Sequence, residues 1–143
     1  MAQKPFTDSV ALVTGATSGI GLATAEAFAK VGCSVVLAGR REELGEPAAE
    51  SIRASGGQAA FVRTDVTDDD QVRRLVEAAV ERFGGLDIAF NNAGIEGDPL
   101  APFHEASLDN FDHVFRTNVR SMFSCIRHEA PAMLAGGGGA IVN

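Results

Sequence analysis

A glycine-rich segment lies where an apolar run gives way to a helix-like segment. The run Val10–Val13 is followed by Thr-Gly-Ala-Thr-Ser-Gly-Ile-Gly over residues 14–21, and helical spacing continues to Lys30. Glycines at such a turn allow a tight bend and a close approach of the backbone to a phosphate, while the N–H groups of the following helix face the anion. The spacing G-x-x-x-G-x-G also occurs in ordinary turns, so this segment alone leaves a phosphate site and a structural turn as alternatives.

Three further polar motifs follow along the chain. Asp65-Val66 ends one apolar run, Asn91-Asn92-Ala93-Gly94 ends another, and Asn118 lies inside a long helix-like segment. Asp65 is placed either to contact a ligand or to cap the next turn. The amide and small residues suit a close approach of a ribose, so Asn92, Ala93 and Gly94 are predicted to line a site and Asn91 to be mainly structural. Asparagine is unfavourable inside a helix, which favours a site role for Asn118 over a surface position.

Together these motifs resemble the short-chain dehydrogenase/reductase family, from about Ser9 to the last residue. The resemblance implies hydride transfer between the nicotinamide of NAD(P) and a small-molecule carbonyl or alcohol. It also implies that Asp65 and Val66 contact the adenine, and that Asn118 is the catalytic asparagine, which holds a water linking the active-site lysine to solvent. The cofactor-binding residues predicted from it are Gly15, Thr17, Ser18, Gly19, Ile20, Gly21, Arg40, Arg41, Asp65, Val66, Asn92, Ala93 and Gly94.

The cofactor preference depends on the end of the second apolar run, Gly39-Arg40-Arg41. NAD-binding members of the family carry an acidic residue at the position of Gly39, whereas an arginine accommodates the 2′-phosphate of NADP. A guanidinium binds a phosphate through two charge-assisted hydrogen bonds, so NADP is the predicted cofactor and NAD a possible one. The alternative is that both arginines are solvated at the start of a helix. Ser18, where some NADP-binding members place a basic residue, weakens the NADP prediction.

The chain departs from the family pattern in one respect. The family's catalytic serine and its Tyr-x-x-x-Lys pair would lie beyond Asn143, and the 143 residues include no tyrosine. Because general acid catalysis needs a proton donor, we expect these residues alone to bind a cofactor and to be inactive. The alternative is a non-catalytic dinucleotide-binding or scaffold module that functions at this length. The coding sequence after codon 143 distinguishes the two.

Apolar runs alternate with helix-period segments along the chain, which predicts an α/β fold with a parallel sheet. Right-handed crossovers make 3-2-1-4-5 the simplest strand order, a Rossmann-type doubly wound sheet truncated after its fifth strand. We expect one incomplete NAD(P)-binding domain over residues 1–143. The predicted strands are Val10–Val13, Ser34–Ala38, Ala59–Val62, Leu86–Phe90 and Ala140–Val142.

The sequence predicts the start of one helix and the apolar face of another. Thr67 precedes three aspartates, so Thr67 is predicted to cap the third helix; Asp68–Asp70 complement the helix dipole, and no metal site is predicted from them. From about Leu108 to Leu134, apolar residues recur at three- and four-residue steps, which predicts one continuous apolar face, most of it packed on the sheet. In the family, the corresponding helix also forms a subunit interface. We therefore expect a homo-oligomer, the frayed edge at Ala140–Asn143 adding to the tendency to associate.

The composition excludes several classes of protein. A net charge of −7 with scattered basic residues argues against nucleic-acid binding. No apolar run is long enough to cross a membrane, and the N-terminus lacks the apolar centre of a signal peptide, so the expected location is cytoplasmic. Cys33 and Cys125 are predicted to be buried, reduced thiols. His104, His113 and His128 lack metal-ligand spacing and are predicted to be surface residues.

Overall fold

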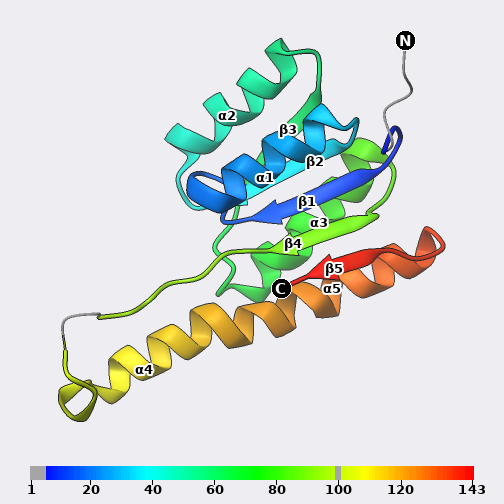
Figure 1. Ribbon diagram of the computed structural model, residues 1–143. Helices are drawn as coiled ribbons and strands as arrows, with labels where there is room; N and C mark the ends of the chain where they lie inside the picture. The colour runs from blue at the N-terminus through cyan, green and yellow to red at the C-terminus, as the bar shows by residue number, and fades with distance from the viewer. Residues whose placement is uncertain (1–5, 99–100) are drawn as a thin grey trace.

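The centre of the fold is a five-stranded parallel sheet. The computed structural model describes residues 6–98 and 101–143, and the strand order is β3-β2-β1-β4-β5 (Figure 1). This confirms the predicted fold class and strand order. The strands are β1 Val10–Thr14, β2 Ser34–Gly39, β3 Gln58–Arg63, β4 Ile88–Asn91 and β5 Ala140–Val142.

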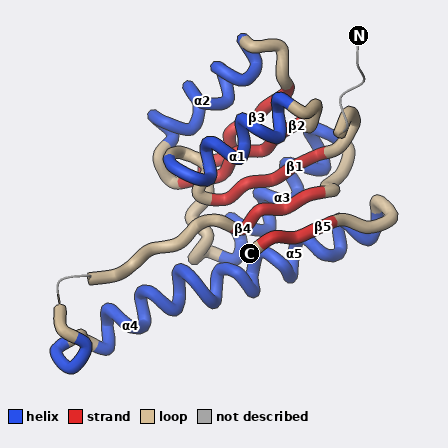
Figure 2. The backbone as a smooth tube through the Cα atoms, viewed as in Figure 1, coloured by secondary structure: helices blue, strands red, loops and turns tan. Residues whose placement is uncertain are grey.

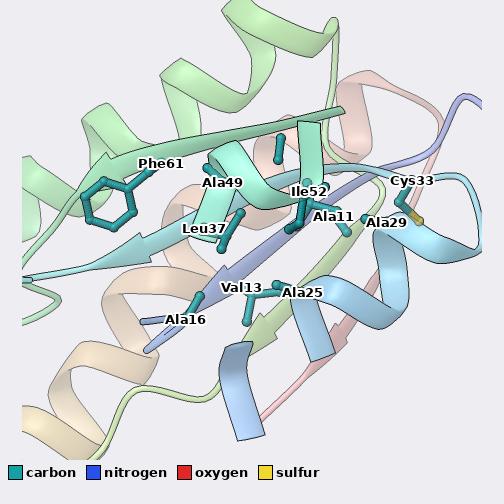
Figure 3. Close-up of a cluster of buried hydrophobic side chains, with 12 residues drawn as sticks. Ala11, Val13, Ala16, Ala25, Ala29, Cys33, Leu37, Ala49, Ile52 and Phe61 are labelled. Atoms are coloured by element: carbon teal, nitrogen blue, oxygen red, sulfur yellow. The ribbon is translucent and has the colours of Figure 1, made fainter. Parts of the chain in front are cut away.

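Helices cover both faces of the sheet (Figure 2). Helices α1 (Gly19–Lys30) and α2 (Glu42–Ala54) pack on one face, and α3 (Asp69–Phe83) and α5 (Ser121–Ala135) pack on the other. Strand β1 is buried along its whole length between these layers, which explains why it reads as a continuous apolar run. Figure 3 shows the side chains of the α1–α2 face, where small residues of the helices meet the aliphatic residues of β1 and β2.

Helix α3 begins one residue later than predicted. Asp68 is its N-cap, and its carboxylate accepts a hydrogen bond from the Gln71 backbone N–H at 3.1 Å. The predicted cap, Thr67, instead donates its hydroxyl hydrogen to Asp65 Oδ1 at 2.7 Å. The prediction was wrong because the carboxylate of Asp65 competes for the Thr67 hydroxyl two residues away, a local arrangement typical of a strand end.

The long helical segment is continuous but is exposed where packing was predicted. It consists of α4 (Leu108–Phe115), a π-helical turn η2 (Arg116–Arg120) and α5, and α4 extends away from the sheet (Figure 1). A short 3-10 turn, Phe103–Glu105, precedes it. Several large apolar residues of the predicted face are roughly half exposed or more: Leu108, Phe111, Phe115, Val119 and Phe123.

The buried face of α5, which packs against α3 and β4, is largely small or polar. Its buried residues are Ser121, Ser124, Cys125, Glu129 and Met133. The prediction that most of the apolar face packs on the sheet was therefore wrong, because hydrophobic periodicity locates an apolar face without showing what covers it. Within residues 6–98 and 101–143, strand β5 pairs with β4 alone and forms the predicted sheet edge. In the part of the chain that the structure describes, no helix is both long and apolar enough to cross a membrane.

Candidate functional site

A cleft of about 480 Å³ opens at the carboxyl end of the sheet, where the segments after β1, β2, β3 and β4 face the helical segment α4–η2. Parallel α/β sheets bind their ligands at this edge. Most of the predicted cofactor-binding residues come together here. The predicted residues that line the cleft are Gly15, Thr17, Ser18, Arg40, Arg41, Asp65, Val66, Asn92, Ala93 and Gly94.

Four predicted site residues lie outside the lining: Gly19, Ile20, Gly21 and Asn118. Gly21 has a packing role, because a Cβ there would lie 2.3 Å from the carbonyl oxygen of Gly15. Gly19, with φ +56°, begins α1 and has open space where a Cβ would point. The backbone at the start of α1 is thus accessible to an anion. The Ile20 side chain is 72% exposed.

The end of β4 is fastened to the glycine-rich turn. Asn92 Nδ2 donates to the backbone oxygens of Thr14 and Gly15 at 3.2 and 3.4 Å, and the Ala93 N–H donates to Thr14 Oγ1 at 3.1 Å. Gly15 has φ +64°, and a Cβ there would lie 2.9 Å from Asn92 Nδ2. A glycine at position 15 is therefore required by both the backbone conformation and this close approach.

The two arginines after β2 have different surroundings. Arg41 Nη2 donates to Thr17 Oγ1 at 3.0 Å and to Ser18 Oγ at 2.8 Å, so the Arg41 guanidinium joins the β2–α2 connection to the glycine-rich turn. Arg40 is exposed at the cleft, where its charge favours ionisation of Asp65. A Cβ at Gly39 would lie 2.6 Å from Thr17 Cγ2, so an acidic side chain at position 39 requires Thr17 to move.

Asp65 caps the turn after β3 and lines the cleft as well. Its Oδ1 accepts hydrogen bonds from the Thr67 N–H at 2.9 Å and from the Thr67 hydroxyl. Partial burial opposes ionisation of Asp65, but these bonds and the Arg40 charge outweigh burial and lower its pKa. The carboxylate is therefore ionised at neutral pH.

The side chain of Asn118 forms hydrogen bonds with the backbone of the segment after β4. Its Oδ1 accepts from the Ile95 N–H at 2.8 Å, and its Nδ2 donates to the Ile95 carbonyl at 2.7 Å. Asn118 is half-buried within the π-helical turn, a rare conformation that occurs frequently at functional sites. These two bonds explain an asparagine at a mid-helix position, where its intrinsic helix propensity is low.

The charge balance of the cleft favours an anionic ligand. Its lining contains three arginines, Arg40, Arg41 and Arg116, and one carboxylate, Asp65. The chain as a whole has a net charge of −7, so this excess of positive charge is local. A glycine-rich turn, an open helix N-terminus and guanidinium groups are the donors that phosphate groups require.

The sequence profile of the short chain dehydrogenases matches residues 9–143. The chain belongs to the short chain dehydrogenase family. It is 47% identical over 142 residues to the A-factor type gamma-butyrolactone 1'-reductase of Streptomyces virginiae, an alignment that covers 99% of this chain and 55% of that enzyme.

Two other relatives in the short chain dehydrogenase family are dehydrogenases named for different compounds. The cis-4-hydroxycyclohexanecarboxylate dehydrogenase of Sinomonas cyclohexanicum is 43% identical over 98% of this chain and 55% of its own length. The cyclohexanol dehydrogenase of an Acinetobacter species is 41% identical over 96% of this chain and 55% of its own length. The chain thus spans about half the length of the curated relatives it matches.

Several residues that line the cleft were not predicted: Thr64, Thr67, Ile95, His113, Arg116 and Thr117. Arg116 and Thr117 follow His113 by three and four residues on the helical segment, a spacing that places them on the same side as His113. That spacing could be read from the sequence, but only the fold shows that this face meets the cleft.

His128 is not a surface residue as predicted: its side chain is 17% exposed and its Nε2 lies 3.1 Å from Asp69 Oδ1. Among residues 6–98 and 101–143, no cluster of three or more acidic, histidine or cysteine side chains is arranged to hold a metal.

Proposed function

We propose that this chain forms the nucleotide-binding part of an oxidoreductase that transfers hydride between a nicotinamide cofactor, preferably NADPH, and a small carbonyl or alcohol. One observation carries the proposal: the cleft at the carboxyl ends of the strands combines a glycine-rich turn with an excess of arginine. Membership of the short chain dehydrogenase family supports it. The relatives are about twice as long, so the activity of a whole enzyme is part of the proposal.

The residues present fit NADP by their donor chemistry. Gly15 and Thr17, which line the cleft, and the start of α1, where Gly19 has open space beside its backbone, would hold the pyrophosphate. Arg40 would bind the 2′-phosphate, because Arg41 is already bonded to Thr17 and Ser18. When bound, the nicotinamide supplies or accepts the hydride, and the chain supplies binding and orientation.

Two further cleft segments complete the proposed site. Asp65 and Val66 would contact the adenine, and Asn92, Ala93 and Gly94 would lie along the ribose. Asn118 keeps its proposed catalytic role only indirectly in this arrangement, because both atoms of its amide bind Ile95. Holding Ile95 fixes the wall that follows Gly94.

We propose a ring ketone, or the corresponding secondary alcohol, as the substrate class. Two relatives are named for such compounds, a cyclohexanol dehydrogenase and a 3beta-hydroxysteroid dehydrogenase that is 42% identical over 96% of this chain. The exposed apolar residues of α4 lie next to the cleft-lining face of the same helix, which is consistent with a compact apolar substrate.

Calorimetric titration of the chain with NADPH and NADH tests the binding proposal. We expect saturable binding of both nucleotides and tighter binding of NADPH. No binding of either nucleotide by a chain that circular dichroism shows to be folded would overturn it. The cleft features by themselves support binding and not chemistry, so the second candidate is a binding module without catalysis. Reduction of cyclohexanone by the chain extended with its downstream coding sequence would decide for the enzyme.

A further inference from the structure

Glu129 is a buried carboxyl group that the proposed function does not use. It lies on the face of α5 that packs against the sheet and is 1% exposed. A buried carboxylate is unfavourable unless charges or hydrogen bonds compensate for the lost hydration. Among the described residues, no lysine, arginine or histidine forms an ion pair with Glu129. The partner that the structure supplies is an amide.

That amide connects three elements of the fold. Asn91, the last residue of β4, donates through Nδ2 to Glu129 Oε2 at 2.9 Å and to Asn143 Oδ1, just after β5, at 3.0 Å. The next residue, Asn92, begins the cleft wall and is bonded to the glycine-rich turn. Glu129 therefore binds Asn91, the residue directly before the cleft wall that is proposed to hold the nucleotide.

One buried acceptor of the cluster lacks a donor. Both Nδ2 hydrogens of Asn91 are used, and its Oδ1 is buried without a hydrogen-bond partner in the described part of the chain. A protonated carboxyl group carries an O–H donor, whereas an ionised one only accepts. A proton on Glu129 would supply the donor that this group of acceptors lacks.

The electrostatic surroundings agree with this interpretation. Burial raises the pKa of Glu129 to about 6, although the Asn91 bond acts in the opposite direction. One turn earlier on α5, burial and the charge of Glu129 raise the pKa of the Cys125 thiol to about 12. From α3, Asp69 faces α5, but it binds Ser124 and His128. Strands β4 and β5 contribute the neutral amides of Asn91 and Asn143.

We propose that Glu129 is a positioning residue: it positions the cleft wall through Asn91, and this positioning depends on whether its carboxyl group is protonated. In its protonated form it fastens Asn91 and Asn143 to α5; when it ionises, the wall at residues 92–94 loosens and nucleotide binding weakens. The inference rests on the nucleotide-binding function proposed above. It adds a pH-dependent control of nucleotide binding by a residue of α5 that acts through the end of β4.

The test compares the pH dependence of nucleotide affinity in the unmodified chain and in Glu129→Gln. Glutamine keeps the size and an acceptor for Asn91, adds N–H donors and does not titrate. NAD⁺ is the probe, because the 2′-phosphate of NADP⁺ itself titrates near pH 6. We expect the Kd for NAD⁺ to rise about threefold or more between about pH 5 and pH 7.5 in the unmodified chain, and to stay nearly constant in Glu129→Gln. Glu50→Gln, at an exposed glutamate of α2, is the matched control and should follow the unmodified chain.

Equal pH profiles in the unmodified chain and in Glu129→Gln, with both binding NAD⁺, would overturn this inference and leave the nucleotide-binding function standing. No NAD⁺ or NADP⁺ binding by the unmodified chain at any pH would overturn the proposed function, and this inference with it. If Glu129→Gln does not fold, carbon-13 NMR titration of the glutamate carboxyl signals in the unmodified chain decides. A midpoint near pH 6 supports the inference, and titration of every glutamate below pH 5 contradicts it.

Discussion

Replacing Arg40 with alanine should weaken NADPH binding and leave NADH binding nearly unchanged. Arg40 lines the cleft, and its neighbour Arg41 is held by Thr17 and Ser18 at 3.0 and 2.8 Å, so of the two arginines after β2, Arg40 is the one available for a 2′-phosphate. Hydrogen bonds to charged groups contribute about 1.5–3 kcal/mol, which corresponds to a loss of roughly 10- to 150-fold in NADPH affinity. The ionised Asp65 lies on the same cleft and attracts Arg40, so the lower half of this range is the better expectation.

Isothermal titration calorimetry with both nucleotides measures this effect, and two variants act as controls. Arg82→Ala removes a charge from the last turn of α3, away from the cleft, and should change neither affinity. Arg41→Ala removes the two bonds to the glycine-rich turn and should weaken both nucleotides alike. NADH binding as tightly as NADPH to the unmodified chain would refute the assignment of NADP. An equal loss for both nucleotides in Arg40→Ala would refute the role given to Arg40.

Four further outcomes are expected. The 143-residue chain should reduce no ketone above background, because it lacks tyrosine as proton donor and general acid catalysis contributes about 10²–10⁴-fold; steady NADPH oxidation with cyclohexanone would point to another acid. Asp68→Ala should lower the free energy of unfolding in denaturant titrations followed by circular dichroism, through loss of the α3 cap, whereas Thr67→Ala should not remove that cap. The folded chain binds the Glu129 proton more tightly than the unfolded chain, so stability should fall as pH rises from about 4.5 to above 6; relative to Glu129→Gln, the loss should be about 2 kcal/mol in urea titrations across this range. Phe123→Glu should shift sedimentation toward monomer, and a concentration-independent monomer before the substitution would contradict self-association through the exposed helix.

Much of the cleft could be predicted from the sequence because parallel strands bring their carboxyl ends to one edge. Residues after β1, β2, β3 and β4 had to lie near one another once the strand order was known, and that order follows from chirality and short crossovers. The glycines at positions 15 and 21 carried a local signal as well. Each allows a close backbone contact that any side chain would block.

The remaining features depend on competition between partners, which sequence spacing does not encode. The Thr67 hydroxyl binds Asp65 rather than capping α3, and Glu129 is buried against an amide of β4, a partner that no spacing within α5 indicates. The amide of Asn118 binds Ile95, a residue with no polar side chain to mark it. In each case several hydrogen-bond partners are possible for one side chain, and only the three-dimensional arrangement shows which partner it binds.

The helical segment α4–η2 connects these features because its two sides meet different surroundings. His113, Arg116 and Thr117 face the cleft, while Phe111, Phe115 and the other large apolar residues are exposed. Such an exposed apolar surface is unfavourable in water and is typical of surfaces that a partner covers. A partner that covered it would also restrict the motion of α4, and therefore of the cleft wall that the same helix provides. Association and nucleotide binding should consequently reinforce each other, since each lowers the conformational entropy that the other must remove.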